Sequence, residues 1–224
     1  FVCVSKTTED SLLGFLSTSG RKNLITKVIP NGLAPMDGHA DSLQAGAMTT
    51  HTNLSIGYIG RLSEEKRPHF LIDTLRFLPP NTQLCIVGDG DMLTVLEDAG
   101  KDLIANGQLK FLGRQASSRD LYTPYQVTLL TSEYEGCPMT ALESLACGVP
   151  CVALPIPAMR ELFGVDAPYL LAHDQTPQAL AIAVLNLAHI PVEQVQADMG
   201  QIVSKHSLRE FARSWYDAMK ISIY

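Results

Sequence analysis

The stretch VTLLTSEYEGCPMTALESLACGVPCVAL, residues 127–154, decides the fold of this chain. It opens with the apolar run Val127–Leu130 and closes with a second apolar run, Pro150–Leu154. Between them, Met139–Cys147 has helical spacing, and Gly148 is placed to end that helix. Two apolar runs joined by a helix are typical of the strand–helix–strand unit of a parallel sheet.

The same alternation runs through most of the chain. Further apolar runs predict strands at Leu54–Ile59, Leu84–Val87, Leu109–Leu112 and Tyr169–Leu171. Helical spacing predicts helices at His69–Leu78, Met92–Ala105 and Pro177–Leu187, with a short crossover near Ser118–Tyr122. These repeats predict an α/β fold, a Rossmann-like doubly wound parallel sheet with helices on both faces.

Two glutamates, Glu135 and Glu143, lie eight positions apart on either side of a sharp turn. Gly136 and Pro138 allow the turn, and Glu143 lies within the helix that follows it. Carboxylates accept charge-assisted hydrogen bonds, and the free N–H groups of a helix N-terminus favour phosphate. A nucleotide-sugar carries both hydroxyls and phosphates. The spacing alone would favour the interpretation that both glutamates are merely solvated. A binding role for them therefore depends on the surrounding sequence.

The context is a convergence at one edge of the predicted sheet. Arg61, Asp89, Gly113 and Glu135 each follow the end of a predicted strand. Ligands of open parallel sheets bind at the carboxyl ends of the strands. The sequence therefore predicts a ligand site at this edge.

Five spaced motifs also follow one another in a set order. They are Gly60-Arg61-Leu62 with Lys66, Val87-Gly88-Asp89-Gly90, Phe111-Leu112-Gly113, Tyr134-Glu135-Gly136 and Glu143-Ser144-Leu145-Ala146-Cys147-Gly148-Val149-Pro150. In this order they resemble the donor-binding, C-terminal half of a family-4 retaining glycosyltransferase with the GT-B fold. The resemblance extends from about Phe1 to the C-terminal helix. It implies transfer of a hexose from a nucleoside-diphosphate sugar to a glycan or lipid-linked acceptor, in glycan, polysaccharide or glycolipid biosynthesis.

The resemblance implies a role for each motif. Arg61 and Lys66 would stabilise the charge that grows on the departing diphosphate, and Glu135 would contact the donor sugar. Glu143 would bind the ribose hydroxyls. The remaining substrate-binding positions would be Gly60, Gly88, Gly113, Arg114, Gly136, Cys137, Pro138, Met139 and Thr140, with Arg114 near the base and the N–H groups around Met139 and Thr140 at the diphosphate. No cofactor or metal is expected beside the donor.

Three positions depart from the family pattern. Arg67-Pro68 stands where glycine is usual, and Pro68 suits the first turn of the next helix. Cys137-Pro138 replaces the common Phe-Gly, so that one N–H donor is lost. Pro157-Ala158 replaces paired glycines, and this loop would contact the acceptor or the sugar differently.

We expect four parts along the chain. Phe1–Leu33, with strands at Phe1–Val4 and Thr26–Ile29, is interpreted as a remnant of an N-terminal Rossmann-like domain that is otherwise missing. Residues 34–53 are polar and aperiodic, as in a linker. Residues 54–206 form the nucleotide-sugar-binding domain, and residues 207–224 a crossover helix.

The predicted crossover helix has an apolar stripe that needs a packing partner. Its residues, at helical spacing, are Leu208, Phe211, Ala212, Trp215 and Met219. Ser207 followed by Glu210 predicts a capping box at its start. The stripe predicts packing on a core. The resemblance implies that the helix crosses back onto the N-terminal domain; without that domain, part of the stripe would pack on Phe1–Leu33 or be exposed.

Composition limits the classes of partner. The chain is 46% apolar and 18% charged with a net charge of −6, which argues against a nucleic-acid partner. It has no apolar run of membrane-spanning length. Five cysteines without a C-x-x-C pair predict buried, reduced thiols, and Cys147 with Cys151 lack a second pair of zinc ligands. We expect a cytoplasmic protein, with the inner face of a membrane as an alternative location.

Two other functions remain open on the sequence. One is a nucleotide-sugar epimerase of the same overall fold. The other is a non-catalytic module that binds a nucleotide or a partner protein. Labelled donors distinguish the transferase from these two alternatives. Only a transferase moves the sugar to an acceptor, and only an epimerase inverts a centre of the sugar.

Overall fold

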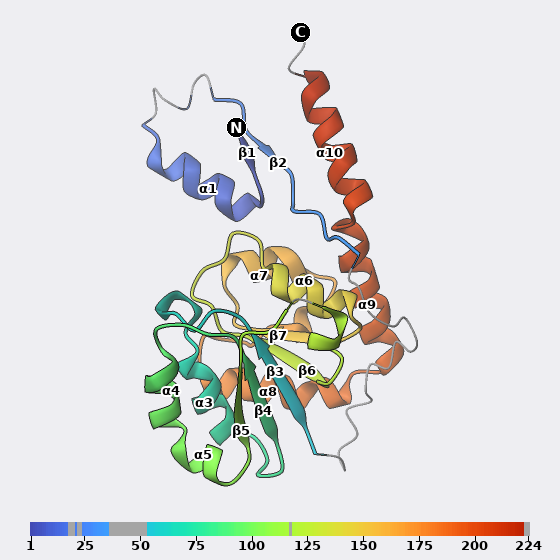
Figure 1. Cartoon of the computed structure of the whole chain (residues 1–224). Helices are drawn as coiled ribbons and strands as arrows, with labels where there is room; N and C mark the ends of the chain where they lie inside the picture. Colours follow the sequence, from blue (N-terminus) through green and yellow to red (C-terminus); the bar gives the residue numbers. More distant parts are fainter. Residues whose placement is uncertain (18–20, 22–23, 36–52, 117, 222–224) are drawn as a thin grey trace.

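The computed structural model describes residues 1–17, 21, 24–35, 53–116 and 118–221 (Figure 1). Its strands are β1 (Val2–Cys3), β2 (Lys27–Val28), β3 (Ser55–Ile59), β4 (Gln83–Val87), β5 (Leu109–Gly113), β6 (Val127–Leu130) and β7 (Cys151–Ala153). Its α-helices are α1 (Lys6–Phe15), α3 (His69–Arg76), α4 (Leu93–Ala99), α5 (Lys101–Ala105), α6 (Met139–Ala146), α7 (Pro157–Phe163), α8 (Pro177–Asn186), α9 (Val192–Lys205) and α10 (Leu208–Ile221). Short 3-10 turns are η1 (Glu64–Lys66), η2 (Arg119–Leu121), η3 (Pro168–Leu170) and η4 (Leu187–His189).

Five parallel strands form the main sheet, in the order β5-β4-β3-β6-β7. The central strand β3 pairs with both neighbours, and Ile56 lies opposite Leu84 on one side and Val127 on the other. Strands β3, β4 and β5 follow one another toward one edge of the sheet, and β6 and β7 follow one another toward the other edge. The switch point of the topology therefore lies between β3 and β6. The predicted Rossmann-like parallel sheet is confirmed.

Helices cover the sheet because its strands are apolar on both faces. All four residues of β6 are buried, and α3 packs against α8 while α6 packs against α9 (Figure 1). At the end of α6, Gly148 adopts φ +79° and its N–H donates to Leu145 O at 3.0 Å. A residue with a side chain is strained at this angle, so the predicted stop after α6 has a physical cause.

Two predicted elements differ in the structure. The strand predicted at Tyr169–Leu171 is wrong: Pro168–Leu170 forms the turn η3, and only Leu171 makes a single bridge, to Ala153. Pro168 has no N–H and a fixed φ, which favours the turn. The helix predicted at Met92–Ala105 is divided at Gly100, where an added Cβ would lie 2.5 Å from Leu109 Cδ2.

Two helices were not predicted from the sequence. α7 begins with Pro157 in its first turn, so Pro157-Ala158 starts a helix and is not a loop. α9 buries Val195, Met199 and Ile202 along one face.

The N-terminal segment forms a small unit of its own, in which β1 and β2 pair in parallel beside α1. Hydrogen bonds join it to the main domain. The carboxylate of Glu161, on α7, accepts from the backbone N–H of Lys6 at 2.6 Å and of Thr7 at 3.0 Å. The N–H of Leu33 donates to His206 O at 2.7 Å. Most of the predicted linker, residues 36–52, lies outside the described residues.

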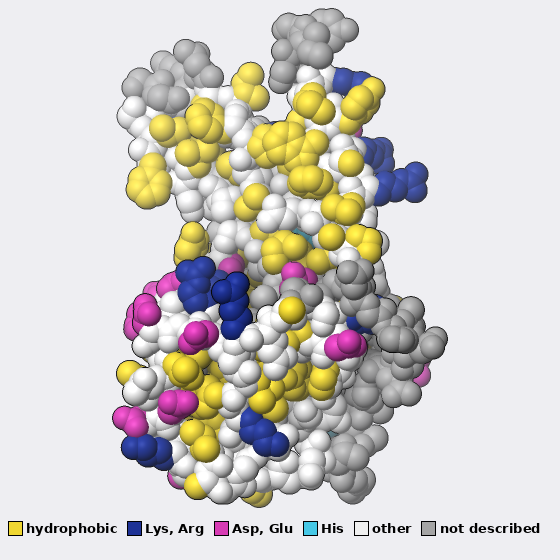
Figure 2. All heavy atoms as spheres, in the orientation of Figure 1, with side chains coloured by type: hydrophobic (Ala, Val, Ile, Leu, Met, Phe, Trp, Pro, Cys, Tyr) yellow, Lys and Arg dark blue, Asp and Glu magenta, His cyan; other side chains and the backbone are white. Residues whose placement is uncertain are grey.

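The apolar stripe of α10 is only partly covered. Phe211 packs on Gly32, where an added Cβ would lie 2.7 Å from Phe211 Cβ. Leu208, Trp215 and Met219 are exposed by 44%, 37% and 56%. Figure 2 shows hydrophobic side chains gathered over the N-terminal segment and α10. At the start of the helix, Ser207 Oγ accepts from the N–H of Glu210 at 3.3 Å, which confirms this half of the capping box.

Candidate functional site

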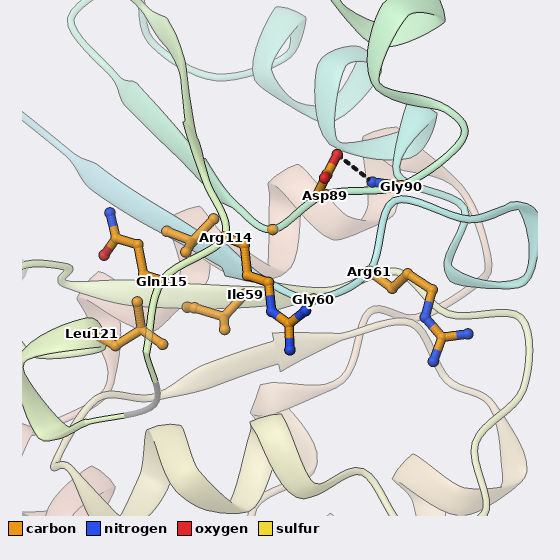
Figure 3. A pocket seen from close by; sticks show the side chains of 10 residues that line it. Ile59, Gly60, Arg61, Asp89, Gly90, Arg114, Gln115 and Leu121 are labelled. Atoms are coloured by element: carbon orange, nitrogen blue, oxygen red, sulfur yellow. Dashed lines mark hydrogen bonds between the residues drawn. The ribbon is translucent and has the colours of Figure 1, made fainter.

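A pocket of about 530 Å³ lies at the carboxyl ends of β3, β4 and β5 (Figure 3). Four of the residues predicted for substrate binding or catalysis line it: Gly60, Arg61, Gly88 and Arg114. In Figure 3 the side chains of Arg61 and Arg114 extend away from the Asp89–Gly90 loop toward the same side. The pocket therefore presents two guanidinium groups at the sheet edge where the strand ends predicted a ligand.

The glycines of this pocket are required by close backbone contact. A Cβ on Gly88 would lie 1.8 Å from Gly60 O, and one on Gly90 would lie 2.3 Å from Leu62 O. The N–H of Leu62 donates to Asp89 O at 3.0 Å, and the N–H of Gly88 donates to the carbonyl of Gly113 at 2.9 Å. Backbone contacts thus hold the loops after β3, β4 and β5 against one another, and these loops form the wall of the pocket.

Arg61 is held only loosely. Its side chain is 73% exposed and its Nη1 lies 3.8 Å from Glu65 Oε1. Exposed pairs of this kind contribute about 0–1 kcal/mol. The backbone of Arg61 is fixed more firmly, because Tyr58 Oη donates to its carbonyl at 3.0 Å. The guanidinium can therefore turn toward a ligand without much cost.

Lys66 and Glu135 form an ion pair between the loop after β3 and the loop after β6. Lys66 Nζ lies 2.6 Å from Glu135 Oε1, and the two side chains are only 26% and 13% exposed. Ser132, which is 2% exposed, donates its hydroxyl to the same Oε1 at 2.7 Å. An ammonium has three N–H donors, so Lys66 can hold Glu135 and still donate to a ligand.

The two loops are also joined through their backbones. The hydroxyl of Thr131 donates to Lys66 O at 2.7 Å, and the N–H of Glu133 donates to Glu65 O at 2.9 Å. These bonds span the switch point between β3 and β6. Lys66 and Glu135 therefore face each other because the sheet topology places their strands side by side.

Arg67 follows Lys66 in a left-handed conformation, with φ +44°. For a residue with a side chain this costs about 1–2 kcal/mol, which explains why glycine suits the position. Here the guanidinium Nη2 donates to Ser132 O at 3.2 Å and to Gln175 Oε1 at 3.0 Å, and the Arg67 Cζ lies 5.1 Å from the centre of the Phe70 ring. These contacts offset the strain.

Glu143 lies on α6 with a fixed partner. Tyr122 Oη donates to Glu143 Oε2 at 2.5 Å. Burial, and then the Glu143 carboxylate, raise the pKa of the Tyr122 phenol, so Tyr122 stays protonated and donates. One carboxylate oxygen of Glu143 is thereby oriented, and the other can accept from a ligand.

The turn between Glu135 and Glu143 packs against the N-terminal segment. A Cβ on Gly136 would lie 3.3 Å from Thr8 Cγ2. Pro138 is the N-cap of α6, and the N–H of Met139 already donates to Cys137 O at 2.9 Å. Of the two N–H groups predicted to meet the diphosphate, that of Met139 is therefore already engaged within the chain.

The sequence did not single out several residues of this region. Ile59, Gln115 and Leu121 line the pocket, and Ser132 and Tyr122 hold the two glutamates. Tyr122 is distant in sequence from Glu143, and no motif marks the pair. Within the described residues, no group of three His, Cys, Asp or Glu side chains could hold a metal ion. No helix in that part of the chain is long and apolar enough to cross a membrane.

The family model "Glycosyl transferases group 1" matches residues 48–206, a range that contains the main sheet and every predicted site residue. The chain belongs to this glycosyltransferase family.

Curated relatives agree with this assignment. The chain is 29% identical over 133 residues to a putative glycosyltransferase, EpsF, of Bacillus subtilis, covering 56% of this chain and 35% of that protein. It is 25% identical over 197 residues to an uncharacterized glycosyltransferase of Methanocaldococcus jannaschii, covering 82% and 49%. It is 33% identical over 102 residues to the lipopolysaccharide 1,6-galactosyltransferase of Escherichia coli, covering 43% and 28%. The chain thus spans less than half the length of each of these relatives.

Solved structures share the fold. The Anabaena protein HepE in complex with UDP has a TM-score of 0.80 at 21% identity, covering 98% of this chain and 63% of that one. The pneumococcal O-GlcNAc transferase GtfA in complex with UDP and GlcNAc has a TM-score of 0.74 at 19% identity, covering 100% and 45%. These likenesses establish the α/β fold of GT-B glycosyltransferases.

Proposed function

We propose that this chain is the C-terminal, donor-binding part of a retaining hexosyltransferase of family 4. It binds a nucleoside-diphosphate sugar and serves transfer of the hexose to a glycan or lipid-linked acceptor. An N-terminal domain, which the relatives' greater length leaves room for, would supply the acceptor site. No cofactor beside the donor is required, and the protein acts in the cytoplasm or at the inner face of a membrane.

The observation that carries the proposal is the placement of Lys66 at the switch point, 2.6 Å from the Glu135 carboxylate, with Arg61 on the same loop after β3. Two cations on one short loop suit a diphosphate, and a carboxylate held by Lys66 and Ser132 suits sugar hydroxyls. Ligands of open α/β sheets bind at this crevice.

The same arrangement suits the chemistry of transfer. As the bond between the sugar and the diphosphate breaks, negative charge grows on the diphosphate oxygens. Cations beside the diphosphate stabilise that charge more in the transition state than in the ground state. Arg61 and Lys66 would take this role, and Glu143, oriented by Tyr122, would accept from the ribose hydroxyls.

Calorimetric titration of the chain with UDP-, GDP- and ADP-sugars tests the donor site. We expect weak binding of one of them when this chain is titrated alone, because closure of a second domain over the donor would strengthen the binding. Lys66→Ala should weaken this binding only moderately, because Lys66 acts most strongly in the transition state. The matched control is Lys101→Ala, since Lys101 pairs with Asp98 at 2.8 Å on the exposed surface. No binding of any nucleotide at millimolar concentration would refute the proposal.

The reaction itself needs the full-length protein and labelled donors. We expect transfer of label to an acceptor with retention of the anomeric configuration. Inversion of a sugar centre without transfer would instead support an epimerase. Binding without either reaction would support a non-catalytic module.

A further inference from the structure

Arg67 connects the two loops that carry the Lys66–Glu135 pair. It is the next residue after Lys66, and its Nη2 donates to the carbonyl of Ser132 at 3.2 Å. Ser132 in turn donates its hydroxyl to Glu135 Oε1 at 2.7 Å, and Glu135 is bound by Lys66 at 2.6 Å. The four residues thus form a closed ring of contacts, in which Arg67 and Lys66 are joined by their own peptide bond.

The backbone conformation at Arg67 favours glycine, so the presence of an arginine must be explained by the contacts of its side chain. At φ +44° a glycine would be unstrained, whereas any residue with a Cβ is strained. The guanidinium is what the arginine adds. It reaches Ser132 O and Gln175 Oε1, and it stacks on the Phe70 ring.

These contacts restrict how far the loop after β6 can move from the loop after β3. Ser132 is 2% exposed, so its backbone has little freedom of its own once its carbonyl is held. Gln175 lies beyond η3, and through it Arg67 is also tied to the segment before α8. A preorganised site loses activity steeply when its groups shift by about 1 Å.

We propose that Arg67 is a positioning residue, which fixes Lys66 and Glu135 relative to each other for the donor. The inference rests on the proposed function, and it adds a residue to which neither motif nor family pattern gives a role. Arg67 acts through Lys66 and Glu135 and not by contact with the donor.

Two substitutions in the full-length protein separate positioning from stability. Arg67→Gly and Arg67→Ala both remove the guanidinium, but only glycine also relieves the strain at φ +44°. The glycine variant should therefore have the higher melting temperature. Both variants should nevertheless lose about 10- to 100-fold in kcat, with a smaller change in the donor KM, because both release the loop after β6.

A matched control is Arg76→Ala, at the far end of α3. Arg76 makes a bidentate ion pair with Asp102, with distances of 2.6 and 2.8 Å, so this variant also loses a guanidinium and its partners. It should keep kcat within about twofold. A similar loss of kcat in Arg76→Ala would show that any destabilised variant is impaired, and it would overturn the inference.

A double substitution tests whether Arg67 acts through Lys66. Arg67→Gly should reduce the residual kcat of Lys66→Ala by less than about twofold, since the group to be positioned is gone. A further tenfold loss would overturn the inference, as would recovery of wild-type kcat in Arg67→Gly. If the wild-type protein neither binds nor transfers any donor, the proposed function fails and this inference with it. If the wild type transfers and the Arg67 variants match it, the inference alone fails.

Discussion

Lys66 Nζ lies 2.6 Å from Oε1 of Glu135, although 69 residues separate the two in sequence. Each residue follows a strand on one side of the switch point, Lys66 after β3 and Glu135 after β6. The ion pair is largely shielded from water, so it holds its geometry before a ligand arrives. A cation with a fixed direction and unused donors can act on a diphosphate without first being reorganised.

Arg61→Ala and Lys66→Ala should each reduce kcat of the full-length enzyme more than they raise the donor KM. The charge on the diphosphate grows as the glycosidic bond breaks, so these cations act most strongly in the transition state. We expect a loss on the order of 10²-fold in kcat. A donor with a better leaving group should be affected less. Steady-state kinetics that show a changed KM with normal kcat would contradict the leaving-group role.

Glu143→Ala should weaken binding of a nucleoside diphosphate by about tenfold or more, the value of one charge-assisted hydrogen bond. Binding of inorganic pyrophosphate should hardly change, because pyrophosphate has no ribose hydroxyls. Tyr122→Phe should give a smaller loss with the same selectivity, since it removes only the hydroxyl that orients Glu143. Calorimetry with both ligands measures this, and equal losses for the two would argue against the ribose contact.

Gly88→Ala should destabilise the fold by at least about 3 kcal/mol. The new Cβ would meet Gly60 O at 1.8 Å, at φ +145°. Gly107→Ala is the control, because Gly107 has φ +81° and no atom within 4 Å of an added Cβ. It should cost only the strain, about 1–2 kcal/mol. Urea denaturation of both variants would show a similar cost if the contact between the loops were unimportant.

Stability should fall as the pH drops below about 6.5, in part because of His206. Burial lowers the pKa of this imidazole from its ordinary value of 6.5, with the Asn31 backbone acting in the opposite direction. Between the pKa of His206 in the unfolded chain and its lower pKa in the folded chain, the unfolded chain binds more protons. The contribution of His206 to the free energy of unfolding is therefore complete above pH 6.5 and is lost as the pH falls below that value.

His206→Gln should flatten this part of the stability curve, as followed by urea denaturation between pH 7.5 and 5. The control is His189→Gln at the exposed last residue of η4, which should keep the wild-type slope. An unchanged slope in His206→Gln would exclude His206 as the group responsible.

Transfer by the full-length protein should persist after treatment with a chelator. In the proposed site Arg61 and Lys66 would supply positive charge at the diphosphate, so a divalent cation would not be needed there. Activity measured after dialysis against EDTA should remain within about twofold of the untreated enzyme. Loss of activity that Mg²⁺ or Mn²⁺ restores would refute the absence of a metal requirement.

The local pattern of the sequence was sufficient for most strands and for the edge at which the site lies. β6 agrees with its predicted range, and β3, β4 and β5 differ by a residue at an end. Apolar runs and glycine stops are local signals, and the rule that ligands bind at the carboxyl ends of parallel strands needs no coordinates. The pattern of α9, with Val195, Met199 and Ile202 on one face, was also present in the sequence and was not used.

The errors arose where one residue outweighs the pattern around it. Pro168 turns an apolar run into η3, because it cannot join a strand ladder. Gly100 divides a continuous helical pattern, because Leu109 packs where a side chain would stand. Pro157 starts α7 where a loop was expected, since proline is well suited to a first helical turn.

The sequence by itself determined the parallel sheet, its ligand-binding edge and the residue types at that edge, because these follow from periodicity and from strand ends. Only the tertiary structure decided which of these residues meet. The pairing of β3 with β6 places Lys66 against Glu135, and the hydrogen bond from Tyr122, just after η2, reaches Glu143 on α6. It also decided the contacts from which we infer a positioning role for Arg67, since neither its positive φ nor its contact with Ser132 exists until both loops are folded.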